Sequence, residues 1–157
     1  MNDTKIRKAV FDDLEDVLRL NLDLFKKEYS EYDKSLDMEW THSEPGEEYF
    51  AERIVGNDGF VCVAEDNGKI IGYICGGLCD RGYRVEGVYA ELENMLVDEK
   101  YRGLGIGKKL GEAFLQWCGV EKVRYINVSA SASNTAGIGF YRSLGFCDYD
   151  VKLQIEK

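Results

Sequence analysis

The residues with the most distinctive chemistry form a short glycine-rich stretch in the second half of the chain. Arg102–Gly107 has glycine at every second position, after an apolar strand-like run and before a helix-like run. Glycines let main-chain N–H groups approach a ligand closely, and the start of the following helix adds partial positive charge. The pattern predicts a phosphate-binding loop, with a tight turn that needs glycine only for its geometry as the alternative.

The spacing excludes two familiar phosphate-binding motifs. A P-loop would need glycine at position 102 and a hydroxyl residue at position 109, where the chain has Arg102 and Lys109. The dinucleotide motif G-x-G-x-x-G would need glycine at position 106 or 108, where the chain has Ile106 and Lys108. Both motifs fail on residue type.

The pattern Arg102-x-x-Gly105-x-Gly107 resembles the pyrophosphate loop of the GNAT superfamily of N-acetyltransferases, which has the form [Gln/Arg]-x-x-Gly-x-[Gly/Ala]. The resemblance extends roughly from residue 60 to residue 146, while the first ~55 residues match only in the type of element.

A second motif of the same family lies downstream of the loop. In the family it is an Asn followed by Ala three residues later, Tyr seven later and Gly-Phe at eleven and twelve. The chain matches it with Asn134, Tyr141, Gly145 and Phe146, and has Gly137 where the family usually has Ala.

The resemblance implies acetyl-CoA as co-substrate, no metal, and direct acetyl transfer to a primary amine in a ternary complex. The acceptor would be a cationic small molecule or a peptide or protein amine. The backbone amides of Gly103–Lys108 would hold the pyrophosphate, and the main chain of Met95–Val97 would pair with the pantetheine arm and the acetyl carbonyl. The full set of cofactor-binding residues that it implies is Met95, Leu96, Val97, Arg102, Gly103, Leu104, Gly105, Ile106, Gly107, Lys108, Asn134 and Tyr141. A CoA-binding sensor that keeps the fold without catalysis is the alternative function.

Four cations independently favour an anionic ligand at this loop. They are Lys100, Arg102, Lys108 and Lys109. Cations at the start of a helix oppose its dipole, and an anionic cofactor would explain them; ordinary surface residues are the alternative.

Acyl transfer to an amine also needs two proton transfers, one from the acceptor and one to the leaving thiolate. Tyr141 matches the family tyrosine that protonates or hydrogen-bonds the leaving sulfur, although packing in the core is an alternative role. Asn134 matches a residue that touches the cofactor, and an N-cap of the last helix is its alternative role.

Two carboxylates in one predicted strand are candidates for the base. Glu91 and Glu93 alternate within residues 88–97, so their Cα atoms lie about 6.6 Å apart on one face. Strand interiors disfavour Glu, which suggests a site, with an exposed sheet face as the alternative. The resemblance places Glu91 at the base position of histone-acetylating members and Glu93 at an acid frequent in small bacterial members; Glu93 is favoured, directly or through water. The same alternation puts Tyr89, Met95 and Val97 with the glutamates and Ala90, Leu92, Asn94 and Leu96 on the other face.

Hydrophobic periodicity predicts the elements that position these residues. The expected order is β-α-α-β-β-β-α-β-α-β, an α/β (α+β) fold with a mixed, mostly antiparallel sheet of about six strands and about four helices. The last strand is expected at residues 147–156, which alternate between apolar and polar. We expect one N-acetyltransferase domain over residues 1–157, with 1–59 as a variable substrate-side half and 60–157 as the acetyl-CoA-binding half.

Composition excludes other classes of function. The net charge is −9, which argues against nucleic acid or an anionic membrane as partner. Five cysteines without a C-x-x-C pair, together with the single His42, argue against a disulfide framework and a zinc site. The start of the chain has no apolar leader, so a reduced, cytoplasmic protein is expected, with His42 in an exposed loop.

The negative charge is concentrated in one segment. Residues 12–52 contain 14 acidic and 4 basic residues, a balance of −10. Attraction of a cationic amine would explain this acidity, as would a merely solvated helix surface. Five aromatic residues are candidates for an acceptor pocket or for the core: Tyr29, Tyr32, Trp40, Tyr83 and Tyr89. The alternating last strand could pair with a second copy, so a homodimer is expected.

Overall fold

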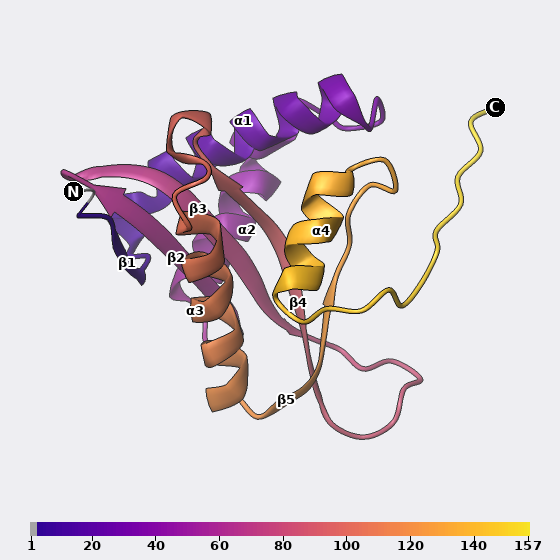
Figure 1. Ribbon diagram of the computed structural model, residues 1–157. Helices are drawn as coiled ribbons and strands as arrows, with labels where there is room; N and C mark the ends of the chain where they lie inside the picture. Colours follow the sequence, from indigo (N-terminus) through magenta and orange to yellow (C-terminus); the bar gives the residue numbers. More distant parts are fainter. Residues whose placement is uncertain (1–2) are drawn as a thin grey trace.

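Five strands form one mixed sheet with helices on both faces (Figure 1), in a computed structural model that describes residues 3–157. The sheet has the order β1-β2-β3-β4-β5; β1 to β4 pair antiparallel, and β5 pairs parallel to β4. The strands are β1 (Lys5–Lys8), β2 (Gly59–Asp66), β3 (Lys69–Cys79), β4 (Val88–Val97) and β5 (Val123–Val128). The predicted α/β fold with a mostly antiparallel mixed sheet is confirmed.

The helices divide between the two faces of the sheet. They are α1 (Leu14–Glu31), α2 (Glu44–Val55), α3 (Ile106–Val120) and α4 (Thr135–Ser143). Helices α1 and α2 enclose one core with the sheet, in which Leu18 and Phe50 are fully buried. Helix α3 encloses the second core on the opposite face, with Leu110 and Phe114 fully buried. Three short 3-10 turns complete the elements: Phe11–Asp13, Trp40–His42 and Glu99–Tyr101.

The predicted sixth strand at residues 147–156 is wrong for this structure. The chain after α4 is extended but pairs with no strand among residues 3–157, and Figure 1 shows it leading away from the sheet. Alternation predicts the face that a strand would bury, but pairing needs a partner backbone that the local sequence does not specify.

A β-bulge in β4 overturns part of the predicted face assignment. Cys75 of β3 pairs with Asn94, and the next residue, Gly76, pairs with Leu92, so Glu93 is an extra residue in β4. Beyond the bulge the alternation is reversed: Leu96 belongs to the core under α1 and α2, and Met95 packs against the core under α3.

The consequence is that Met95 and Val97 lie on the face opposite the glutamates, contrary to the prediction. Asn94 lies on the face of α2, where its Nδ2 donates to Tyr49 Oη at 3.2 Å. One extra residue thus directs two polar side chains toward α2 and returns Met95 toward α3.

Within residues 3–157 no helix has the length and apolar character that a membrane span requires. The five cysteines form no disulfide in this part of the chain, and three of them, Cys62, Cys75 and Cys118, are buried.

Candidate active site

The glycine-rich loop joins the end of β4 to the start of α3 (Figure 1). Gly103 and Gly105 both have φ of +77°, and Gly105 is the N-cap residue of α3. This left-handed region favours glycine because a side chain would collide with the backbone. A Cβ at either position would meet no atom within 4 Å, so the space outside the loop is open to a ligand.

The loop offers main-chain donors and positive charge on its exposed side. The first N–H groups of α3 have no acceptor within the helix, and no side chain of residues 3–157 caps them. Arg102 and Lys108 are exposed beside them, and Arg102 Nε donates to the carbonyl of Val97 at 2.9 Å. These features fit a pyrophosphate, as the resemblance implied.

Strand β4 extends beyond its neighbour β5. Their pairing starts at Val88–Val123 and ends at Leu92–Val128, so within the described chain β4 has no strand partner on this side after the bulge. An extended ligand could therefore pair with the main chain of Met95–Val97.

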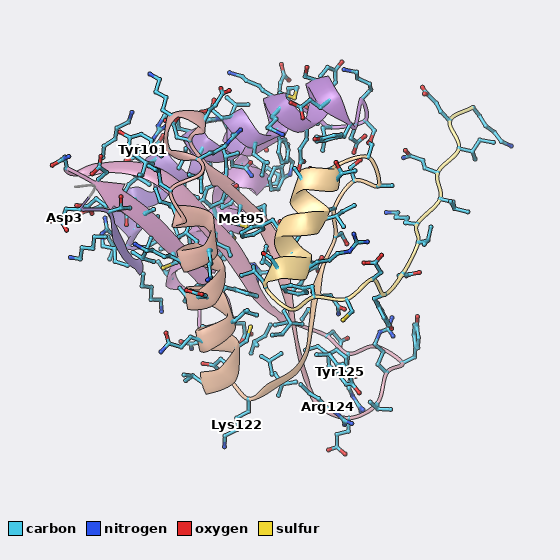
Figure 2. The ribbon with its side chains drawn as sticks, viewed as in Figure 1. Asp3, Met95, Tyr101, Lys122, Arg124 and Tyr125 are labelled. Atoms are coloured by element: carbon cyan, nitrogen blue, oxygen red, sulfur yellow. The ribbon has the colours of Figure 1, made fainter. Side chains whose placement is uncertain are left out.

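Met95 lies where three elements meet, between α3 and α4 in the view of Figure 2. A Cβ on Gly107 of α3 would lie 3.5 Å from the Phe140 ring of α4 and 3.9 Å from Met95 Cε. These are ordinary van der Waals distances, so the start of α3, the end of β4 and α4 lie close together at this point.

A cavity of about 260 Å³ adjoins this edge of β4. It brings together three predicted site residues, Glu93, Met95 and Tyr141. Of the five candidate aromatic residues only Trp40 lines it, and Glu91 does not. Its lining residues are Asn21, Leu24, Phe25, Glu28, Trp40, Tyr49, Glu93, Asn94, Met95, Ser129 and Tyr141.

Tyr141 projects from α4 toward the cavity and packs on Phe146, with ring centroids 6.0 Å apart. Burial, together with the negative charge of Glu28, raises the pKa of Tyr141 to about 12. The hydroxyl is therefore protonated at neutral pH and can act as a hydrogen-bond donor inside the cavity.

Glu93 is held by two residues of α2. Its carboxylate receives Arg53 Nε at 3.1 Å and Arg53 Nη2 at 2.5 Å, and it also accepts a hydrogen bond from the Tyr49 hydroxyl. Burial is the main reason why the pKa of Tyr49 is raised, so this hydroxyl stays a donor. Both carboxylate oxygens of Glu93 are therefore occupied by α2.

Glu91 lies on the same side of the sheet as Glu93 but outside the cavity lining. Burial and the nearby Glu93 charge raise its pKa, while the charge of Arg53 opposes this shift. Its role as a base remains a prediction.

Asn134 caps α4 and links it to α1. Its Oδ1 accepts from the backbone N–H of Gly137 at 2.9 Å and from the Tyr32 hydroxyl at 3.4 Å. A Cβ at position 137 would lie 2.5 Å from Asn134 Nδ2, so Gly137 leaves room for this side chain. The cap is confirmed, and a contact with a cofactor remains a prediction.

Sequence reasoning missed Glu28, Tyr49, Arg53 and Asn94. On α1 the signal was available, because Asn21, Leu24 and Glu28 follow the i, i+3, i+7 spacing of one helix face. On β4 the sequence gives no signal for Asn94, because no local pattern predicts the bulge that changes its face. His42 is exposed at the end of its short turn, outside the cavity lining, and residues 3–157 contain no group of three or more His, Cys, Asp or Glu suited to a metal ion.

Comparisons with known proteins agree with this geometry. The family model described as the acetyltransferase (GNAT) family matches residues 18–146. An uncharacterized N-acetyltransferase of Methanocaldococcus jannaschii is 29% identical over 150 residues, which cover 93% of this chain and 62% of that protein. The chain thus spans less than two thirds of the length of this curated relative.

Solved structures share the fold. A mutant of the BH1408 protein of Bacillus halodurans has a TM-score of 0.79 at 22% identity, covering 98% of this chain and 99% of that one. The aminoglycoside N-acetyltransferase AAC(6')-Iy, crystallised with CoA, has a TM-score of 0.76 at 18% identity, covering 100% and 96%. With most of its length matched by the family model and both motifs in place on β4, α3 and α4, the chain belongs to the acetyltransferase (GNAT) family.

Proposed function

We propose that the protein is an N-acetyltransferase that transfers the acetyl group of acetyl-CoA to a primary amine in a ternary complex. The observation that carries this proposal is that Tyr141 and Met95 line one cavity, beside an unpaired strand edge that leads to the glycine-rich loop. Acetyl-CoA supplies the thioester that is broken.

Each part of the chain has a separate task in this proposal. The N–H groups of Gly103–Lys108, with Arg102 and Lys108, bind the pyrophosphate. The main chain of Met95–Val97 orients the pantetheine arm and the acetyl carbonyl. Tyr141 donates a hydrogen bond to the leaving sulfur, because its raised pKa keeps the hydroxyl protonated. The pKa of Tyr141, about 12, lies above the pKa of about 8.5 of a thiol, so complete proton transfer from Tyr141 to the sulfur is unfavourable. The hydroxyl therefore stabilises the thiolate by donating a hydrogen bond to it.

Glu93 belongs to the acceptor wall in this proposal. Its charge fixes Tyr49 and Arg53 in place, and it can pass a proton only through a water that reaches past them. Asn134 positions α4, and with it Tyr141, relative to α1.

The acceptor is proposed to be a cationic amine. The acidic segment at residues 12–52 supplies α1 and the Trp40 turn to the cavity, so the acceptor side of the molecule carries negative potential. Acetyl transfer to aminoglycosides by a protein of the same fold is compatible with this class, and so is a peptide N-terminus.

The direct test is calorimetry with acetyl-CoA, followed by thiol release over a panel of amines. Binding with release of CoA in the presence of an amine supports the enzyme. Binding without turnover on any amine favours a CoA-binding sensor, and no binding at millimolar acetyl-CoA contradicts both.

We also propose a homodimer in which the segment at residues 147–157 of each protomer pairs with β5 of the other. Four alternating apolar residues in this segment, Tyr149, Val151, Leu153 and Ile155, are 68–89% exposed, and β5 is an edge strand with an open outer side. Each chain therefore has an alternating segment and an open strand edge that do not pair with each other. Two copies related by a two-fold axis can pair the segment of one chain with the edge of the other.

Analytical ultracentrifugation tests the dimer. The wild-type chain is expected to sediment as a dimer, and the double variant Leu153→Asp, Ile155→Asp as a folded monomer. A wild-type monomer, or a double variant that is still dimeric, would contradict strand exchange. The cytoplasmic location remains a prediction.

A further inference from the structure

Glu28 is the carboxylate in the cavity that no neighbour engages. It lies near the end of α1 and lines the cavity, and its carboxylate makes no hydrogen bond or ion pair among residues 3–157. Its neighbour Lys27 pairs instead with Glu31 at 3.0 Å, on the outer side of the helix. A half-buried carboxylate without a partner is costly to a folded chain, which suggests that a ligand supplies the partner.

Asn94, which also lines the cavity, has a second unpaired acceptor. Its Nδ2 is directed at the Tyr49 hydroxyl, and its Oδ1 is buried without a hydrogen-bond partner in the described chain. An oxygen without a donor and a carboxylate without a cation are the complement of an ammonium group, which brings three N–H donors.

Glu93 does not compete for this role. Arg53 and Tyr49 already occupy its oxygens, and the ion pair with Arg53 would have to break before Glu93 could receive a proton. The cavity therefore contains one engaged carboxylate from β4 and one free carboxylate from α1.

We propose, on the basis of the proposed acetyl transfer, that the acceptor binds as a primary ammonium between Glu28 and Asn94 Oδ1, and that Glu28 accepts its proton. The N–H bond breaks, and the proton moves to a Glu28 carboxylate oxygen. The nitrogen then uses the freed electron pair to bond to the acetyl carbonyl carbon, and the carbon–sulfur bond breaks toward the sulfur that Tyr141 faces. Of the two protons still on the nitrogen, one stays as the amide N–H and the other leaves as the amide forms and ends on the thiolate, while Glu28 later releases its proton to water.

The walls of the cavity define the class of acceptor. Leu24 and Met95 are apolar, and Phe25 and Trp40 stack with ring centroids 5.9 Å apart. A volume of about 260 Å³ with these walls suits a primary amine on an apolar or aromatic carbon chain, whose charged end reaches the acidic groups.

The surroundings of Glu28 raise the pKa of its carboxyl above that of an ordinary glutamate. Burial raises its pKa, Lys27 lowers it and Asp33 raises it further. The other titratable groups that face it are Tyr73 on β3, Tyr49 on α2, Glu93 on β4 and Tyr141 on α4. Because only the ionised carboxylate accepts a proton, kcat/KM is expected to rise with pH through the raised pKa of Glu28.

The test compares Glu28→Gln with wild type at two pH values, using 2-phenylethylamine and spermidine as acceptors and CoA release as readout. At about pH 7 the variant is expected to lose about 100-fold in kcat/KM for 2-phenylethylamine. An alkyl amine has a pKa of about 10.4, so at about pH 9.5 more of the acceptor has already lost its proton. The loss in kcat/KM is therefore expected to shrink to less than about tenfold at this pH.

Asp23→Asn is the matched control, since it removes the same charge from an exposed position of α1 outside the cavity. It should keep wild-type kcat/KM at both pH values. Asn94→Ala should raise KM more than it lowers kcat, and thermal denaturation of each variant shows that it is folded.

Two results would overturn the assignment. A loss for Glu28→Gln that is equal at both pH values would mean that Glu28 only supports the structure, and no loss would mean that another group accepts the proton. If wild type acetylates spermidine but not 2-phenylethylamine, the apolar acceptor class is wrong while the acetyltransferase stands. If it binds no acetyl-CoA, the proposed function itself fails.

Discussion

The donor and acceptor ends of the proposed site are built in different ways. The donor end is one continuous segment, from Met95 to Lys109, and offers main-chain groups positioned by left-handed glycines. The acceptor end is assembled from side chains on α1, α2, β4 and α4, which are far apart in sequence. Main-chain recognition requires particular residue types at fixed spacing, so the donor end can be recognised as a sequence motif. The acceptor end can be recognised only in the folded structure, where its side chains come together.

The largest expected effect would come from disturbing the main-chain end. Gly105→Val places a β-branched residue at φ of +77°, which costs about 1–2 kcal/mol and covers the N–H groups of the loop. We expect acetyl-CoA to bind at least about 100-fold more weakly by calorimetry. Gly119→Val, in the same helix but with ordinary φ and open space, is the control and should keep its affinity. Equal affinity in both variants would place the cofactor elsewhere.

The next effect is expected where the two ends meet. Tyr141→Phe removes the hydroxyl that we propose as hydrogen-bond donor to the leaving sulfur, and kcat should fall about 100-fold with little change in acetyl-CoA affinity. Because the pKa of Tyr141 is about 12, wild-type kcat should show no loss from this group between about pH 6 and pH 10. Steady-state kinetics over that range provide the check, and unchanged turnover in the variant would remove Tyr141 from the mechanism.

At the acceptor end a conservative change should cost stability as well as activity. Glu93→Gln leaves Arg53 half-buried without its ion pair, which should lower the free energy of unfolding by about 2 kcal/mol and Tm by roughly 6 °C. Asp16→Asn breaks an exposed ion pair with Arg19 and should cost less than about 0.5 kcal/mol. If thermal denaturation gives the two variants the same Tm, the network around Glu93 does not hold the wall together.

The smallest effect is expected from the long-range charge of the acceptor end. The −10 balance of residues 12–52 should attract a cationic acceptor, so its kcat/KM should fall several-fold between about 50 mM and about 500 mM salt. A neutral arylamine acceptor measured alongside should show no such fall. If kcat/KM for the cationic acceptor does not change with salt, the acidic residues are only a solvated surface and do not attract the acceptor.

These differences also decide how much the sequence could predict. Gly103 and Gly105 were predictable because only glycine suits their backbone, and α1 and α3 because a single buried face repeats along each helix. The side-chain partners of Glu93 were not predictable, since Tyr49 and Arg53 precede it by 44 and 40 residues and meet it only where α2 packs on the sheet. The last strand failed for a related reason, because its apolar alternation specifies a face but not the strand that it pairs with.

The bulge at Glu93 has a consequence for insertions and deletions in this strand. Because Glu93 is the extra residue between the Cys75–Asn94 and Gly76–Leu92 pairs, its removal would leave Asn94–Val97 on their present faces and in their present register. Removal of Ala90 or Leu92 would instead shift residues against their partners and turn part of the strand over. Position 93 is therefore where β4 can lose one residue without reversing the sides that Asn94 and Met95 face.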